Sequence, residues 1–167
     1  MNMPDCEQAE KLADQLLAEY PGLVKRAGYG ETVLFYNPTG LLPAGVYFAS
    51  LKNHDGPNDQ GSHLDRDGVF RVAFGLPDAA YEGLFGPRPP RPGKGRVVHL
   101  ERDFATLDRL TPHPVYAWMG WVQMLSPSAR NWQEIKPYLE ESHRRAVALH
   151  DKRIRSSADV SRESRGE

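Results

Sequence analysis

The apolar residues near the start of the chain repeat with the period of a helix. They recur at i, i+3, i+4, i+7, i+8 and i+11, which places them on one helical face: Ala9, Leu12, Ala13, Leu16, Leu17 and Tyr20. Pro21 and Gly22 follow directly and disfavour any continuation. The pattern therefore predicts an amphipathic helix from about Asp5 to Tyr20.

The next apolar runs are short and rich in β-branched and aromatic residues, which indicates strands. They span residues 23–26, 32–36, 46–52, 69–75, 97–100 and 116–125. The first three are joined by connections too short for a parallel crossover, so these strands are predicted to be antiparallel. Short helices are predicted at 77–84 and 104–110, and a C-terminal helix carries an apolar seam interrupted by Pro137: Trp132, Ile135, Leu139, Ala146 and Leu149.

Two internal segments and the C-terminal tail lack regular periodicity. Residues 53–67 are rich in Gly, Pro, Asn, Asp and His, and irregular loops of this length are more often functional or mobile than simple connectors. Residues 86–96 read GPRPPRPGKGR and predict an extended basic loop. We expect a single α+β domain over 1–151, a mostly antiparallel sheet with N- and C-terminal helices packed on it, and a charged, disordered tail at 152–167.

Composition narrows the class of protein. Of 167 residues, 40% are hydrophobic and the formal net charge is -1, so the chain can form a core and has no general attraction for nucleic acid. The single cysteine, Cys6, excludes an internal disulfide and suits a reducing compartment. No apolar run approaches the roughly 20 residues that cross a bilayer. We expect a soluble, cytoplasmic protein with no membrane partner.

Three motifs carry a resemblance to a known family: Tyr-Asn-Pro at 36–38, LDRDGVFRV at 64–72, and HPVY at 113–116 followed by GWV at 120–122. Through them residues 31–150 resemble a bacterial domain-of-unknown-function family, number sixty-one ninety-four, which implies no established activity. More remotely, GWV, a Ser-Pro break and the helix near 132–145 are similar to the MmcQ/YjbR group. That similarity implies a small α+β fold and DNA binding, although the loops at 53–67 and 86–96 do not belong to its pattern.

Strand alternation directs several polar side chains to one face of the predicted sheet. Because side chains alternate with period two, Arg71 points away from Phe70, Val72 and Phe74. The same alternation places Lys52 and Ser50 on one face of their strand with Phe48 and Val46. It likewise places Tyr36 on the same face as Leu34, and Gln123 on the same face as Trp121. If these sets lie on one side, cations stand over an aromatic floor in a pocket suited to a carboxylate or phosphate. The candidate ligand-binding residues are Arg71, Lys52, Tyr36, Trp118, Trp121, Gln123, Asp65 and Arg66.

His113 is the candidate for proton transfer. Pro112 and Pro114 hold it rigidly just before the last predicted strand, at the rim of the expected pocket. The alternative interpretation is that it caps backbone groups at the strand entry. His54, His63 and His113, with Asp55, Asp59 or Asp65, have metal-ligand chemistry, but no pair has helical i, i+4 spacing. We expect no metal and no organic cofactor, and the sequence does not decide whether the protein is an enzyme.

The leading hypothesis is a protein that binds a small anionic or polar molecule in this pocket. In an alternative interpretation without a ligand, Arg71 is a surface residue paired with Asp65 or Asp67. The aromatic floor could equally form a homodimer interface. A second functional class is a nucleic-acid or protein interaction module built on the loop at 86–96, whose cations could contact phosphates: Arg88, Arg91, Lys94 and Arg96. The balanced net charge argues against nucleic acid as the main partner.

Overall fold

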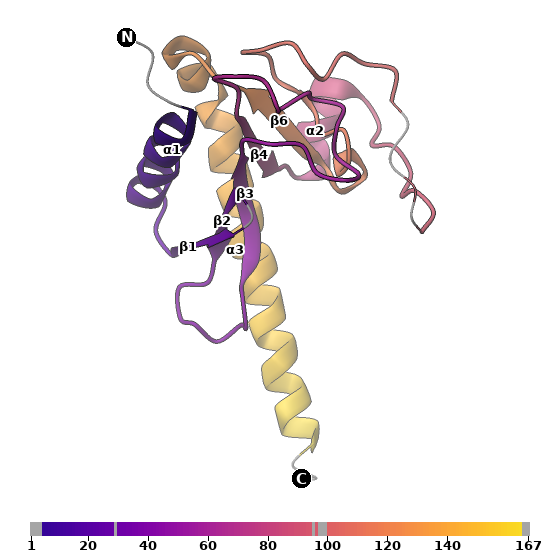
Figure 1. Ribbon diagram of the computed structural model, residues 1–167. Coiled ribbons are helices and arrows are strands. Elements are labelled where there is room, and N and C mark those ends of the chain that lie inside the picture. Colours follow the sequence, from indigo (N-terminus) through magenta and orange to yellow (C-terminus); the bar gives the residue numbers. More distant parts are fainter. Residues whose placement is uncertain (1–4, 29, 95, 97–99, 165–167) are drawn as a thin grey trace.

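The computed structural model describes residues 5–28, 30–94, 96 and 100–164. It has a six-stranded, fully antiparallel sheet in the order β1-β2-β3-β4-β6-β5, with helices α1 and α3 packed against it (Figure 1). The strands are β1 (Leu23–Gly28), β2 (Glu31–Tyr36), β3 (Val46–Lys52), β4 (Arg71–Gly75), β5 (Thr111–Pro112) and β6 (Trp121–Leu125). The helices are α1 (Asp5–Glu19), α2 (Asp78–Phe85), the 3-10 turn η1 (Ala117–Met119) and α3 (Ala129–Ser164). The predicted α+β class is therefore confirmed.

The main core lies between one face of the sheet and the two terminal helices. β4 and β6 contribute alternate residues to it, including Val72, Phe74, Val122 and Met124, all nearly inaccessible to solvent. The facing helices contribute Ala13 and Leu16 from α1 and Trp132, Ile135, Leu139 and Ala146 from α3. Burying a large aliphatic or aromatic side chain stabilises a fold by about 1.5–3 kcal/mol, so this layer fixes which sheet face the helices cover.

A β-bulge in β3 changes which side chains share a face. Leu34 pairs with Ala49 while Phe35 pairs with Tyr47, so Phe48 is an extra residue on the β3 side. The bulge shifts the alternation by one position, and Phe48 packs on Tyr20 of the helix layer while Lys52 lies on the opposite face. The prediction that Lys52 and Phe48 share a face is wrong for this reason.

Two predicted elements differ from the structure, and a third lies mostly outside the described residues. Residues 104–110 form an irregular segment instead of a helix, with Asp108 in the left-handed region at φ 59°. The last strand begins at Trp121 rather than at 116, because η1 and Gly120 at φ 84° form a turn before it. Of the strand expected at 97–100, residues 97–99 lie outside the described part of the chain.

Helix α3 is 36 residues long and includes Pro137. Its start is capped by Ser128, whose Oγ accepts a hydrogen bond from the Asn131 N–H at 3.1 Å. The helix continues to Ser164, where the sequence led us to expect a disordered tail, and it extends well beyond the sheet (Figure 1). Once a helix is nucleated by packing, each further residue adds to it at low cost. No helix in the described ranges has the length and apolar content needed to span a bilayer.

Candidate functional site

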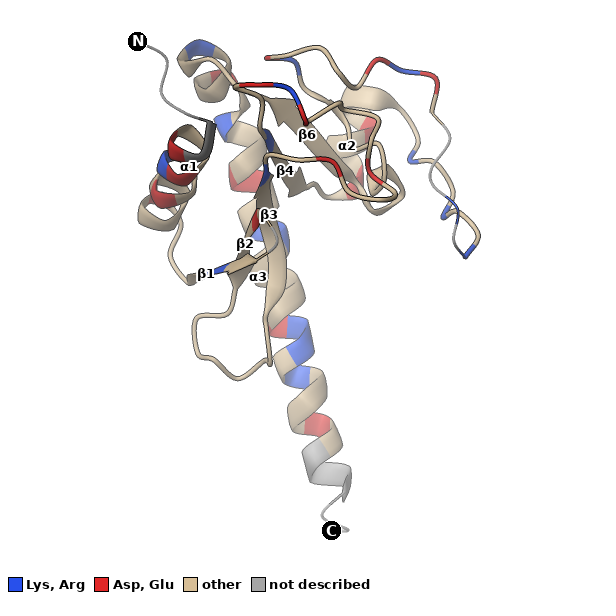
Figure 2. Cartoon of the chain, viewed as in Figure 1, with Lys and Arg blue, Asp and Glu red and all other residues tan. Residues whose placement is uncertain are grey.

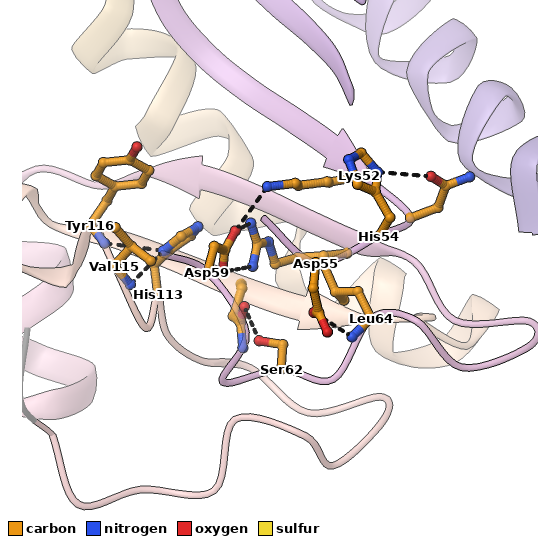
Figure 3. A network of polar contacts seen from close by, with 12 residues as sticks. Lys52, His54, Asp55, Asp59, Ser62, Leu64, His113, Val115 and Tyr116 are labelled. Carbon is orange, nitrogen blue, oxygen red and sulfur yellow. Dashed lines mark hydrogen bonds and ion pairs between the residues drawn. The ribbon is translucent and has the colours of Figure 1, made fainter. Parts of the chain in front are cut away.

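Two cations from neighbouring strands meet one carboxylate on the sheet face away from α1 and α3. Arg71 of β4 lies directly opposite Lys52 of β3 in the strand register, so both side chains rise from the same place on that face. Asp59, from the loop between these strands, accepts two hydrogen bonds from Arg71, Nη1 to Oδ1 at 2.9 Å and Nη2 to Oδ2 at 2.5 Å. Lys52 Nζ reaches the same Oδ2 at 3.2 Å (Figure 3).

This ion cluster is largely shielded from water. The Arg71 side chain is only 2% exposed, and those of Lys52 and Asp59 are 13% and 12% exposed. Burial alone raises the pKa of Asp59, but the hydrogen bonds and charge of Arg71, with the charge of Lys52, outweigh burial and hold that pKa well below 3.8. Arg71 Nε is buried with no hydrogen-bond partner among the described residues. These three side chains thus carry two positive charges and one negative charge. Glu31, opposite Lys52 in the β2–β3 register, is a further carboxylate on this face but makes no ion pair with Lys52.

Three of the residues predicted to bind ligand hold the loop between β3 and β4 (residues 53–70), the covering loop, in place. Gln123 accepts a hydrogen bond from Ser62 Oγ at 3.0 Å and donates to Phe104 O and Thr111 Oγ1, both at 3.2 Å. Arg66 donates to three backbone carbonyls, those of Ser62, His63 and Ala105. Asp65 accepts a hydrogen bond from the Asp55 N–H at 3.1 Å. These contacts fasten the loop over Arg71.

His113 lies beside this cluster with its tautomer fixed by the backbone. Its Nδ1 accepts hydrogen bonds from the N–H groups of Val115 at 3.0 Å and Tyr116 at 3.1 Å, so the proton of the neutral ring is on Nε2. Burial first, and then the charge of Arg71, hold the pKa of His113 well below 6.5. The free side of the ring faces Asp59 (Figure 3). His113 therefore presents a hydrogen-bond donor to the site, and its backbone contacts match the capping interpretation.

A hollow of about 360 Å³ adjoins the cluster at Asp59. Its walls come from the covering loop and from the segments before η1, and they include Pro57, Asn58, Gln60, Phe104, Pro114 and Val115. Four of the lining side chains are apolar and three are polar, those of Asn58, Asp59 and Gln60, and Asp59 is the member of the cluster that reaches the hollow. This size suits a small molecule. Tyr116 packs against His113 with ring centroids 5.0 Å apart and the ring planes tilted by 43°, and it is 48% exposed.

The other predicted aromatic residues lie elsewhere. Tyr36 is on the helix-covered face, with ring centroids 5.5 Å from His143 and 5.0 Å from His150 of α3. Trp118 lies in η1 beneath the guanidinium of Arg91, which is 4.8 Å from its ring centroid. Trp121 pairs with Gly75 at the far end of β4 from Arg71. The structure thus brings Lys52, Arg71 and His113 together and leaves these three aromatic residues outside the cluster.

Asp59 is the residue of this site for which the sequence predicted only metal-ligand chemistry and no pairing with Arg71. The pairing is indicated in the sequence by an acid-containing loop between two strands that each carry a cation on the same face, Lys52 on β3 and Arg71 on β4. Among the residues described, no three His, Cys, Asp or Glu side chains are grouped so as to hold a metal ion. The carboxylate that pairs with Arg71 is that of Asp59, whereas the sequence had suggested Asp65 or Asp67.

The basic loop at 86–96 projects from the sheet, and its Lys and Arg positions are spread along it (Figure 2). Arg88 forms an ion pair with Asp78 at 3.0 Å, and Arg91 stacks on Trp118. Lys94 and Arg96 are exposed. Two of the four cations therefore have partners on the domain, which divides the continuous basic patch that the sequence suggested.

Comparison with known families adds one finding. The sequence matches, over residues 7–155, the group described as "Family of unknown function (DUF6194)". The chain belongs to this family. The match contains the whole cluster, from Lys52 to Tyr116, so this architecture lies within the DUF6194 region. Neither the curated proteins nor the solved structures gave a match, and the MmcQ/YjbR similarity is not shown by these comparisons.

Proposed function

We propose that the protein binds a small carboxylate in the hollow beside Asp59, with Lys52 as the principal cation. The observation that carries this proposal is the excess positive charge of the cluster, two cations that share one carboxylate and have side chains only 2% and 13% exposed. A second carboxylate, supplied by a ligand, would balance that charge. Charge-assisted hydrogen bonds in such a shielded place are stronger than those in water.

Lys52 is better suited than Arg71 to change partners. Arg71 is held by two hydrogen bonds to Asp59, whereas Lys52 contributes one of its three donors to the same oxygen. Gly56 leaves room for this ammonium group, because an added Cβ there would lie 3.0 Å from Lys52 Nζ. A ligand carboxylate can therefore recruit Lys52 while the Asp59–Arg71 pair stays intact.

The neighbouring groups favour binding over catalysis. His113 offers Nε2–H as a further donor to an anion, and the apolar walls at Pro57, Phe104 and Val115 suit a short carbon chain. A general base needs a free lone pair and a pKa near the working pH. His113 faces the cluster with a proton and Asp59 is paired with Arg71, so these groups support binding of an anion and not proton abstraction.

Calorimetric titration and thermal shift with acetate, propionate and succinate, against chloride at equal ionic strength, test this proposal. We expect saturable stabilisation of the wild type and at least a tenfold weaker effect in Lys52→Met, which leaves the Asp59–Arg71 pair in place. Lys25→Met is the matched control, because Lys25 is also a strand lysine close to an aspartate, 3.8 Å from Asp14, but is exposed on β1. Equal responses in Lys52→Met and wild type, or no response to any carboxylate, would overturn the proposal.

A further inference from the structure

A second group of polar donors lies at the other end of β4, outside the site described above. An added Cβ on Gly75 would lie 2.9 Å from Trp121 Nε1 and 3.0 Å from Arg145 Nη1. The indole N–H and the guanidinium therefore meet over a glycine that leaves them room. In the described parts of the chain, neither group has a hydrogen-bond or ion-pair partner. Trp121 is only 7% exposed as a residue, yet its Nε1 is not among the buried unpartnered atoms of the described residues, so this N–H reaches a solvent-accessible place.

Arg88 brings another cation to the same place. Its side chain lies against Gly120, where an added Cβ would be 3.6 Å from Arg88 Cδ. Gly120 is next to Trp121, and its carbonyl accepts a hydrogen bond from the Leu76 N–H, so Arg88 and Arg145 flank neighbouring backbone. Asp78 is bound to Arg88 at 3.0 Å and is the carboxylate whose charge bears on Arg145.

The charges around Arg145 are unbalanced. Burial, followed by the charge of Arg88, lowers the pKa of Arg145, and Asp78 opposes this effect. Arg153 contributes a third, more distant cation from two turns further along α3. Arg88 is paired with Asp78, and Arg153 donates to the Gly45 carbonyl at 3.5 Å, so the guanidinium of Arg145 is the one left without a partner among the described residues. Uncompensated charge of this kind is costly unless it is solvated or meets an anion.

We propose that Arg145, Arg88 and the indole of Trp121 form a phosphate-binding site, distinct from the carboxylate site. Guanidinium groups match phosphate oxygens with paired N–H donors, and a doubly charged phosphate balances two arginines better than a carboxylate does. The site lies at Gly75, about 13 Å along β4 from Arg71 at a rise of about 3.3 Å per residue. The ligand is inorganic phosphate or the phosphate group of a monoester.

Nuclear magnetic resonance of the wild-type protein tests the site directly. The indole N–H signal of Trp121 is assigned as the one missing in Trp121→Phe, and inorganic phosphate and glycerol phosphate are titrated separately at constant ionic strength. We expect a saturable shift of this signal, with the Trp132 indole as an internal reference. Tighter binding of one probe supports the site and identifies its source. A Trp121 signal that moves with neither probe overturns the proposal.

Variants then separate a specific site from general charge. Arg145→Gln is expected to weaken phosphate binding at least tenfold, while Arg144→Gln is the matched control, because Arg144 is its exposed neighbour on α3 and pairs with Glu141. Lys52→Met should leave phosphate binding unchanged, so this proposal and the carboxylate proposal can fail separately. Equal losses in Arg145→Gln and Arg144→Gln, or none in Arg145→Gln, would contradict the assignment.

Discussion

Arg71 and Asp59 are twelve residues apart in the chain and are joined by two hydrogen bonds in a fork, at 2.9 and 2.5 Å. The pair connects the loop to the strand that follows it, so the loop folds back over β4. Because Arg71 is 2% exposed, its charge has no access to bulk water and depends on Asp59. Buried pairs of this kind contribute little net stability when intact but cost much when one partner is removed.

Replacing Asp59 by Asn should therefore destabilise the protein strongly. We expect a loss of roughly 3 kcal/mol in the free energy of unfolding, since the buried guanidinium keeps its charge and loses its counterion. Urea denaturation measures the change. Asp67→Asn is the control, because Asp67 is an exposed carboxylate that follows in the same connection, and it should change stability by less than about 0.5 kcal/mol. Similar losses in the free energy of unfolding for the two variants would show that the Asp59–Arg71 pair does not stabilise the fold.

Acid should destabilise the fold through two groups, whose losses begin at different pH values. His113 has a pKa below 6.5 in the folded protein, so its contribution is present above pH 6.5 and is lost as the pH falls below it. The pKa of Asp59 is held below 3.8, so its contribution is present above pH 3.8 and is lost as the pH falls further.

Melting temperatures measured against pH separate these two groups. His113→Asn, which keeps an acceptor near the Nδ1 position, should flatten the curve just below pH 6.5. Asp59→Asn should flatten it only below pH 3.8. His63→Asn controls for removing an exposed imidazole. A wild-type decline between pH 6.5 and 4 that persists unchanged in His113→Asn would contradict the assignment of that window.

Asp108 should be the most sensitive position in the segment before β5. It adopts φ 59° and its carboxylate accepts hydrogen bonds from the Ser128 N–H at 2.6 Å and from Asn131 Nδ2 at 2.9 Å, which anchors the start of α3. We expect the free energy of unfolding to fall in the order wild type, Asp108→Asn, Asp108→Gly, Asp108→Ala. Alanine loses the hydrogen bonds and also strains the left-handed backbone, for a total of roughly 2–3 kcal/mol.

The difference between the alanine and glycine variants measures that strain separately, because glycine tolerates the left-handed region. Equal stability of Asp108→Gly and Asp108→Ala would contradict a strained backbone at this position. Chemical denaturation of the wild type and the three Asp108 variants, all in the same buffer, measures these differences in the free energy of unfolding.

Tyr20 should make the protein sensitive to alkali. Burial, with the nearby charges of Glu19 and Glu140, raises the pKa of Tyr20 from 10.0 to about 12. Its contribution to stability is therefore present below pH 10 and is lost as the pH rises towards 12. Tyr20→Phe keeps the ring against Phe48 and should lose less stability than the wild type between pH 10 and 11. Parallel declines would show that the hydroxyl is not the titrating group.

Local pattern was sufficient to predict most elements of the fold. The spacing of Leu12, Leu16 and Tyr20 predicted α1, and alternation around Val72 and Phe74 predicted β4. Both signals depend on residues close in the chain, which experience the same helix or strand geometry wherever the element packs. For the same reason, the sequence correctly put Arg71 and Gln123 on the face opposite Val72 and Met124.

The functional geometry depended on contacts that no local pattern records. The bulge at Phe48 reversed the alternation of β3, and the helices covered the face that holds Tyr36. The choice of Asp59 over Asp65 as the partner of Arg71 was decided by how the loop folds across the sheet.

What the sequence by itself determined is the set of elements and the residues that alternate within each. Only the tertiary structure decided which sheet face stays free of helices, which acid neutralises the buried arginine and which nitrogen of His113 carries its proton. These last features arise from packing between segments far apart in the chain. Their energies depend on burial and on hydrogen-bond partners that exist only after the segments have met.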